Sequence, residues 1–108
     1  MAWLVRDGEV LSSLEEARSR RARARGLLGR DGIDGALFLP RTRSVHTFGM
    51  RFPIDVAFLD ADGRVVKVTT LRRNRVTRPV WSARSVLEAE AGSFREWSLT
   101  AGDELEIR

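Results

Sequence analysis

The stretch IDVAFLDADGRVVKVTTL, residues 54 to 71, constrains the fold more than any other part of the chain. Its first half alternates in a way that is typical of a β-strand with two different faces. Asp62-Gly63 is a favoured two-residue turn, and a second apolar strand pattern follows it. We therefore predict a β-hairpin between strands Ile54–Asp60 and Arg64–Leu71, with Asp62-Gly63 at its tip. One face of the first strand would carry Ile54, Val56 and Phe58, and the other would carry Asp55, Ala57 and Leu59.

Weaker signals on both sides complete a mainly β pattern. Asp7-Gly8 predicts a second hairpin near the start of the chain. Residues 12–30 predict a helix, because Ser12 or Ser13 can cap it and arginines follow an acidic first turn. Strands are predicted at 36–40, 85–91 and 104–108, and a short helix or turn at 92–99. The predicted fold class is α+β: a mostly antiparallel β sandwich or partly open barrel with one N-terminal helix.

The composition is that of one globular domain, residues 1–108, with 43% hydrophobic residues. The absence of cysteine excludes disulfides, thiolate metal sites and a cysteine nucleophile. One histidine leaves few metal ligands, so we expect neither a metal site nor a cofactor. No apolar run approaches the roughly 20 residues that span a bilayer, and the N-terminus lacks a secretory pattern. We therefore expect a cytoplasmic protein without a membrane partner, and a monomer.

Basic residues gather in one region of the sequence. The net charge is +4; residues 64–87 contain seven basic side chains and no acidic one, whereas residues 88–108 contain six acidic ones. The Arg72–Arg84 segment also contains Trp81, and arginines beside an aromatic ring can bind single-stranded nucleic acid. No nucleic-acid recognition signature accompanies them. We predict a mainly solvated basic surface with only weak and unspecific nucleic-acid binding.

The loop before the predicted hairpin, VHTFGMRFP at 45–53, contains the residues best suited to chemistry. His46 is the only histidine, and an unperturbed histidine titrates near neutrality. Phe48 and Met50 can line a ligand pocket, although apolar residues in such a pattern are also typical of a core. Side chains of this loop are therefore candidates to line a ligand pocket.

Asp55 follows this loop at the start of a strand, where a buried carboxylate needs hydrogen-bond partners. It can accept the backbone N–H groups of Gly49 and Met50 and so hold the loop in place. Alternatively it can pair with Arg25 or Arg30, or act as a ligand anchor or general base. We predict that Asp55 mainly anchors the loop.

Several longer motifs resemble the prokaryotic DUF192 family, a family of uncharacterised function. The similar segments are RARGLLGR at 23–30, ALFLP at 36–40, HTFGMRFPIDVAFLDADGRVV at 46–66, VLEAEAG at 86–92 and AGDELEI at 101–107. The family's central pattern is occupied here by His46, Phe48, Met50, Pro53 and Asp55. Many relatives carry a tryptophan just before the methionine, where this chain has FGMRF. The resemblance implies a compact, mainly β domain with one N-terminal helix, and it implies no reaction.

Three functions remain open on this basis. The first is a binding or accessory module with a pocket around the His46–Asp55 motif, for an anionic small ligand or a protein. The second is a small enzyme with His46 and Asp55 as acid and base. The third is a weak nucleic-acid binder that uses the Arg72–Arg84 segment. The predicted ligand-binding residues are His46, Phe48, Met50, Asp55, Arg25 and Arg30.

Overall fold

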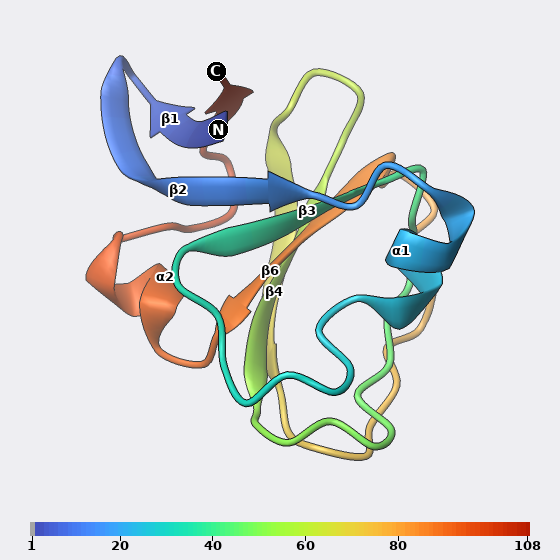
Figure 1. Ribbon diagram of the computed structural model, residues 1–108. Helices are drawn as coiled ribbons and strands as arrows, with labels where there is room; N and C mark the ends of the chain where they lie inside the picture. Colours follow the sequence, from blue (N-terminus) through green and yellow to red (C-terminus); the bar gives the residue numbers. More distant parts are fainter. Residues whose placement is uncertain (1) are drawn as a thin grey trace.

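The computed structural model describes residues 2–108 as one curled β-sheet with two short helices (Figure 1). The strands are β1 Ala2–Arg6, β2 Glu9–Glu16, β3 Ala36–Pro40, β4 Ile54–Leu59, β5 Val65–Leu71, β6 Ser85–Glu90 and β7 Glu106–Ile107. The helices are α1 Arg20–Arg25 and α2 Ser93–Glu96. Within residues 2–108, no helix has the length and apolar character needed to span a membrane.

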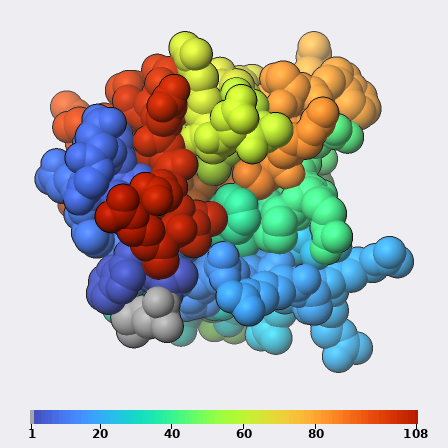
Figure 2. Space-filling view, turned by 90° about the horizontal axis from the view of Figure 1, so that it is seen from above, coloured from blue at the N-terminus to red at the C-terminus, as the bar shows by residue number. Residues whose placement is uncertain are grey.

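The sheet runs in the order β5–β4–β6–β3–β2–β1–β7. Its pairs are antiparallel except for β2 and β3, which run parallel. The segment before β7 joins the two ends of the sheet, because Val65 donates its N–H to the carbonyl of Asp103 (2.8 Å). Figure 2 shows this C-terminal segment, in red, between the blue N-terminal strands and the yellow-green loop before β5. The result is a half-barrel of mainly antiparallel strands, which confirms the predicted fold class.

Apolar side chains cover both faces of the central strands β4 and β6. The inner cluster consists of Leu4, Leu14, Ala36, Ala57, Leu59, Val65, Leu87, Ala89, Phe94 and Leu99. It lies on the concave side of the sheet, because strands from both ends of the sheet contribute to it. The outer cluster consists of Ala17, Leu27, Leu37, Leu39, Val45, Met50, Ile54, Val56, Phe58, Leu71, Ala83 and Val86. The two faces predicted for strand 54–59 are therefore confirmed.

Both predicted hairpins form. Asp7 and Gly8 connect β1 to β2 with φ values of 51° and 79°, the left-handed conformation that a type I′ turn requires. In the loop between β4 and β5, the carboxylate of Asp60 accepts the N–H groups of Asp62 (2.9 Å) and Arg64 (3.0 Å). Local turn chemistry thus determines both connections.

The helix predicted for residues 12–30 is much shorter in the structure. The first part of this range belongs to β2, which pairs with β1 on one side and with β3 on the other. Helix α1 begins after its N-cap Ser19, whose Oγ accepts the N–H of Ala22 (3.0 Å). Pairing on both sides of β2 outweighs the weak local capping signal upstream. Because β2 and β3 are parallel, residues 17–35 form a crossover, and it packs against the outer cluster.

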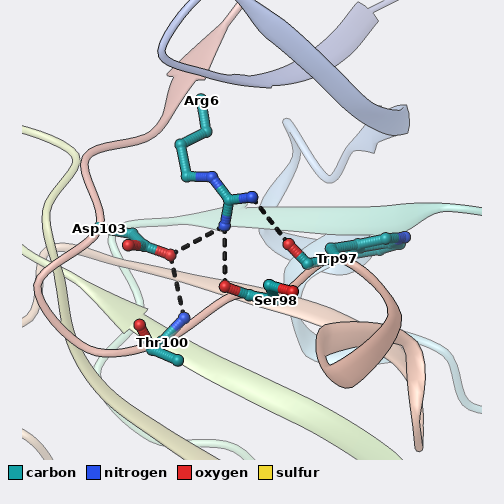
Figure 3. A network of polar contacts seen from close by, with 5 residues as sticks. All are labelled: Arg6, Trp97, Ser98, Thr100 and Asp103. Carbon is teal, nitrogen blue, oxygen red and sulfur yellow. Dashed lines mark hydrogen bonds and ion pairs between the residues drawn. The ribbon is translucent and has the colours of Figure 1, made fainter.

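A polar network fixes the segment after α2 to β1 (Figure 3). The guanidinium of Arg6 donates to the carbonyls of Trp97 (2.8 Å) and Ser98 (3.0 Å). It also donates to the carboxylate of Asp103 (3.0 Å), which accepts the N–H of Thr100 (3.0 Å). These contacts hold the C-terminal segment where it closes the sheet.

Candidate binding site

A cavity of about 310 Å³ lies on the outer side of β3 and β6. It is covered by residues 23–28 of the crossover and by residues 42–50 of the loop before β4. The buried part of its lining consists of Leu27, Leu39, Val45, Met50 and Glu88. The exposed part consists of Ala24, Arg25, Leu28 and His46. The cavity therefore combines an apolar interior, one buried carboxylic acid and a basic entrance.

Residues 42–50, the cavity loop, are held by the segment Arg72–Arg84, the basic segment, which follows β5. Thr47 is fully buried, and its N–H donates to the carbonyl of Arg75 (2.8 Å). Its Oγ1 in turn accepts the N–H of Arg75 (2.9 Å). The N–H of Gly49 donates to the side chain of Asn74 (3.1 Å). The backbone of the basic segment thus has a structural role, as the support of the cavity loop.

The basic segment points its charges into solvent. The arginines at 72, 73, 75, 78 and 84 are all exposed, and Trp81 is 74% exposed. Nucleic-acid binding by these side chains stays a prediction.

Asp55 is an anchor, but the prediction that it holds the cavity loop is wrong. Its carboxylate is buried and accepts the hydroxyl of Thr70 (2.7 Å) and the N–H groups of Gly92 (2.9 Å) and Phe94 (3.1 Å). It therefore fixes the start of α2 to β4 and β5. Strand alternation places Asp55 on the inner face, whereas the cavity loop covers the outer face. The N–H of Met50, one of the predicted donors, goes instead to the carbonyl oxygen of Thr47 (3.1 Å) in the loop itself.

Glu88 is the carboxylic acid of the cavity, and it was not among the site residues predicted from the sequence. In the sheet it lies opposite Leu37 and Val56, so it shares the outer face with apolar side chains. It is 4% exposed, and its Oε1 has no hydrogen-bond partner among residues 2–108. Burial raises the pKa of Glu88 to about 7, since the charged form loses its hydration. The available signal was its position in SVLEAE, where alternation places it on the same face as Val86.

Gly26 allows the crossover to approach this acid closely. Its φ of 50° and ψ of −126° belong to a region that residues with a side chain rarely adopt. A Cβ atom at this position would lie 3.2 Å from Oε1 of Glu88. The absence of a side chain at Gly26 therefore permits the backbone turn and leaves space for the carboxyl group of Glu88.

The arginines beside the cavity differ in how they are engaged. Arg23 donates to the carbonyl of residue 18 (3.3 Å), and Arg25 donates to that of Leu28 (3.4 Å); neither is ion-paired to a carboxylate within residues 2–108. Arg30, in contrast, forms a bidentate pair with Glu15 (2.9 and 3.1 Å), and this hydrogen bonding raises its pKa. Arg30 is outside the cavity lining. Two guanidinium groups thus remain available to an anion at the entrance.

His46 stands at the exposed side of the cavity. Its Nδ1 accepts the N–H of Phe48 (3.2 Å), so the proton of the neutral ring resides on Nε2. The two rings stack with centroids 5.4 Å apart, and Phe48 is 52% exposed. Residues 2–108 contain no group of three His, Asp or Glu side chains arranged to hold a metal ion.

The cavity unites only some of the residues predicted for it. His46, Met50 and Arg25 line it together. Phe48 stacks on the ring of His46 but lies outside the lining, as do Arg30 and Asp55. His46 and Asp55, the proposed acid and base, therefore do not share a pocket, because they belong to opposite faces of the sheet.

Comparison with known proteins identifies relatives that match most or part of this chain. The model of the DUF192 family, described as "Uncharacterized ACR", matches residues 2–107. A UPF0127 protein of Thermococcus gammatolerans is 39% identical over 87 residues, which cover 75% of this chain and 57% of that protein. A UPF0127 protein of Pyrococcus abyssi is 40% identical over 63 residues, covering 58% of this chain and 54% of that protein. This chain therefore spans little more than half the length of these curated relatives.

Two crystal structures share the fold. A protein of unknown function from Novosphingobium aromaticivorans has a TM-score of 0.79 at 19% identity, over 97% of this chain and 82% of that chain. A putative transcription regulator from Sinorhizobium meliloti has a TM-score of 0.80 at 23% identity, over 98% of this chain and 91% of that chain. At these identities the likeness concerns the fold alone. The family match, which extends over residues 2–107, confirms the resemblance seen in the sequence motifs: this chain belongs to the DUF192 family of uncharacterised proteins.

Proposed function

We propose that this protein is a small binding module whose outer cavity accepts a small organic anion. The observation that carries the proposal is Glu88, a buried acid whose Oε1 has no hydrogen-bond partner among residues 2–108, at the apolar inner end of the cavity. An unpartnered buried polar group destabilises a fold, and perturbed acids concentrate at binding and catalytic sites.

The rest of the lining supports an anion with an apolar body. Leu27, Leu39 and Val45 offer apolar contact inside. Arg23 and Arg25 offer positive charge and have no carboxylate partner among residues 2–108. A volume of about 310 Å³ is at the lower end of the range for small-molecule sites. The proposal retains His46, Met50 and Arg25 as contact residues and places Glu88 where Asp55 was expected.

A second candidate is acid–base catalysis in the same cavity. The observation in its favour is that Glu88, with a pKa of about 7, and His46 both line the cavity. An acid that is half ionised near neutral pH is suited to proton transfer. Turnover of a bound compound, lost in both Glu88→Gln and His46→Gln, would favour this candidate over simple binding.

The proposal can be tested by a fragment screen. Amide chemical shifts of the labelled protein would be followed during addition of a library of small carboxylic and phosphonic acids. We expect hits to shift residues 23–28, 42–50 and 88, and to lose affinity in Ala24→Trp, which fills the exposed part of the lining. Ala101→Trp, at an exposed turn outside the lining, is the matched control and should bind as the unmodified protein does. A screen without hits in the cavity, or hits indifferent to Ala24→Trp, would refute the proposal.

A further inference from the structure

The chemical groups of the cavity are arranged in a fixed order from inside to outside. The buried end has the carboxyl group of Glu88, the walls are apolar, and the exposed side has Arg25 with the half-buried Arg23 beside it. A ligand that matches this order must itself have two different ends.

We propose that the ligand is a small organic anion whose inner end carries an uncharged O–H or N–H donor, which hydrogen-bonds to the carboxylate of Glu88 while the anionic group contacts Arg23 and Arg25. This inference rests on the function proposed above and specifies its ligand class.

The case for a donor at the inner end follows from the surroundings of Oε1. No protein group among residues 2–108 donates to this atom, and its neighbours across the sheet are Leu37 and Val56. A purely apolar ligand would remove the carboxyl group further from water and offer it nothing in return. A ligand O–H or N–H would instead supply a charge-assisted hydrogen bond in a dry environment, where such bonds are strong.

The case for an uncharged donor follows from the entrance. Arg23 and Arg25 approach from α1, and His46 approaches from the loop. Among residues 2–108, these three and Glu88 are the titratable groups of the cavity lining. From β3 and β4, the residues that face Glu88 are apolar. A cationic amine would therefore meet repulsion on entry, whereas a carboxylate or phosphate would be attracted.

Ligands with and without a hydrogen-bond donor should differ in whether protons are released or taken up on binding. Near pH 7 the acid of the free protein is partly protonated, because burial raises the pKa of Glu88 to about 7. A donor stabilises the charged form, so binding of the proposed ligand class should release protons. A ligand that only fills the cavity stabilises the neutral form, so its binding should take up protons. The sign of the proton change therefore separates the two kinds of ligand.

The experiment uses three probes of nearly equal size: 4-hydroxybenzoate, 4-methylbenzoate and 4-hydroxybenzamide. Titration calorimetry at pH 7 in two buffers with different ionisation enthalpies gives both affinity and proton change. We expect 4-hydroxybenzoate to bind about tenfold more tightly than either other probe, the ratio expected for one charge-assisted hydrogen bond, and to release protons. In Glu88→Gln the preference for the hydroxyl should shrink and the proton release should disappear. Glu104→Gln, at an exposed position outside the lining, is the matched control and should retain both.

Two failures are distinguishable. Equal binding of the hydroxyl and methyl probes in the cavity, or proton uptake with both, would refute the donor at the inner end and leave the binding module standing. Failure of all three probes and of the acid library to bind would overturn the binding module and this inference with it.

Discussion

Asp55 and Glu88 are two buried carboxyl groups on neighbouring strands with opposite surroundings. Asp55 on β4 faces the inner cluster and accepts three hydrogen bonds, one from Thr70 and two from backbone N–H groups. Glu88 on β6 faces the outer side, where its Oε1 has no partner among residues 2–108. Their registers differ by one residue, since Asp55 lies opposite Ala89 and Glu88 opposite Val56. A difference of one residue in register therefore decides which face of the sheet a buried acid occupies, and whether it stabilises or destabilises the fold.

A structural acid differs from a functional one in where its hydrogen-bond donors come from. A buried carboxylate that supports a fold has donors supplied by the fold itself, as Asp55 has. A buried acid in a cavity, without such donors, lowers stability and is retained at the expense of the fold.

The largest effect is expected from Asp55→Ala. The change removes three hydrogen bonds to a charged acceptor, and it leaves the buried N–H of Phe94 and the part-buried N–H of Gly92 without that acceptor. We therefore expect a loss of about 3 to 5 kcal/mol in the free energy of unfolding. Urea unfolding at pH 7 measures it. A loss below about 1 kcal/mol would mean that these donors find other partners, and the contrast between the two acids would vanish.

Glu88→Gln should have the opposite effect, and one that depends on pH. The folded-state pKa of about 7 lies above the usual 4.5, so the unfolded chain loses its proton first as the pH rises. Stability of the unmodified protein should fall between pH 4.5 and about pH 7 and then stay low, whereas the glutamine variant lacks this fall. We expect the stability gain of Glu88→Gln to be about 2 to 3 kcal/mol larger at pH 8 than at pH 5. Parallel stability profiles for the two proteins would contradict the raised pKa.

Gly26→Ala tests the space around the unpartnered acid. The new Cβ would occupy an unfavourable backbone conformation and lie 3.2 Å from Oε1 of Glu88, so we expect a loss of about 2 kcal/mol. Gly8→Ala is the control, because Gly8 also has a positive φ but has no atom within 4 Å of the added Cβ. Thermal melts of the two variants compare them. An equal loss of stability in both variants would show that the contact between the added Cβ and Glu88 does not destabilise the fold.

Thr70→Val should have the smallest effect of the four. It removes one of the three donors to Asp55 and leaves the two backbone donors in place, so we expect a loss of about 1 kcal/mol. Chemical denaturation of Thr70→Val and of Asp55→Ala shows how much of the stability provided by Asp55 depends on the hydroxyl of Thr70. A loss close to that of Asp55→Ala would show that Thr70, and not the start of α2, is the main partner.

The parts of the fold that local chemistry determines could be predicted from the sequence. The hairpin turn at Asp7-Gly8 follows from a dipeptide preference, and the two faces of β4 follow from strict alternation. The helix predicted over 12–30 failed because pairing of β2 on both sides is a tertiary effect that no local pattern reveals. The capping signal and the order of acidic and basic residues were weak guides there.

The candidate site was predictable in part, for the same reason. His46 and Met50 lie in one loop, so their proximity follows from the chain itself. The buried acid of the cavity comes from a strand some forty residues later, and only the register of β6 beside β4 brings it there. The partners of Asp55 likewise depend on which face of the sheet meets α2, and alternation alone did not reveal this.

Residues 20–28, the part of the crossover nearest the cavity, bury few side chains, and this has a consequence for the motion of the protein. None of the residues of α1 is buried, and between residues 20 and 28 only Leu27 is. Release of one buried leucine costs about 2 kcal/mol, far less than the roughly 5 to 15 kcal/mol that unfolding a whole domain requires. This segment should therefore detach while the sheet stays intact, and its backbone amides should exchange with deuterium well before those of β4 and β6. Opening of this segment would widen the exposed side of the cavity, which its residues 23–28 help to form.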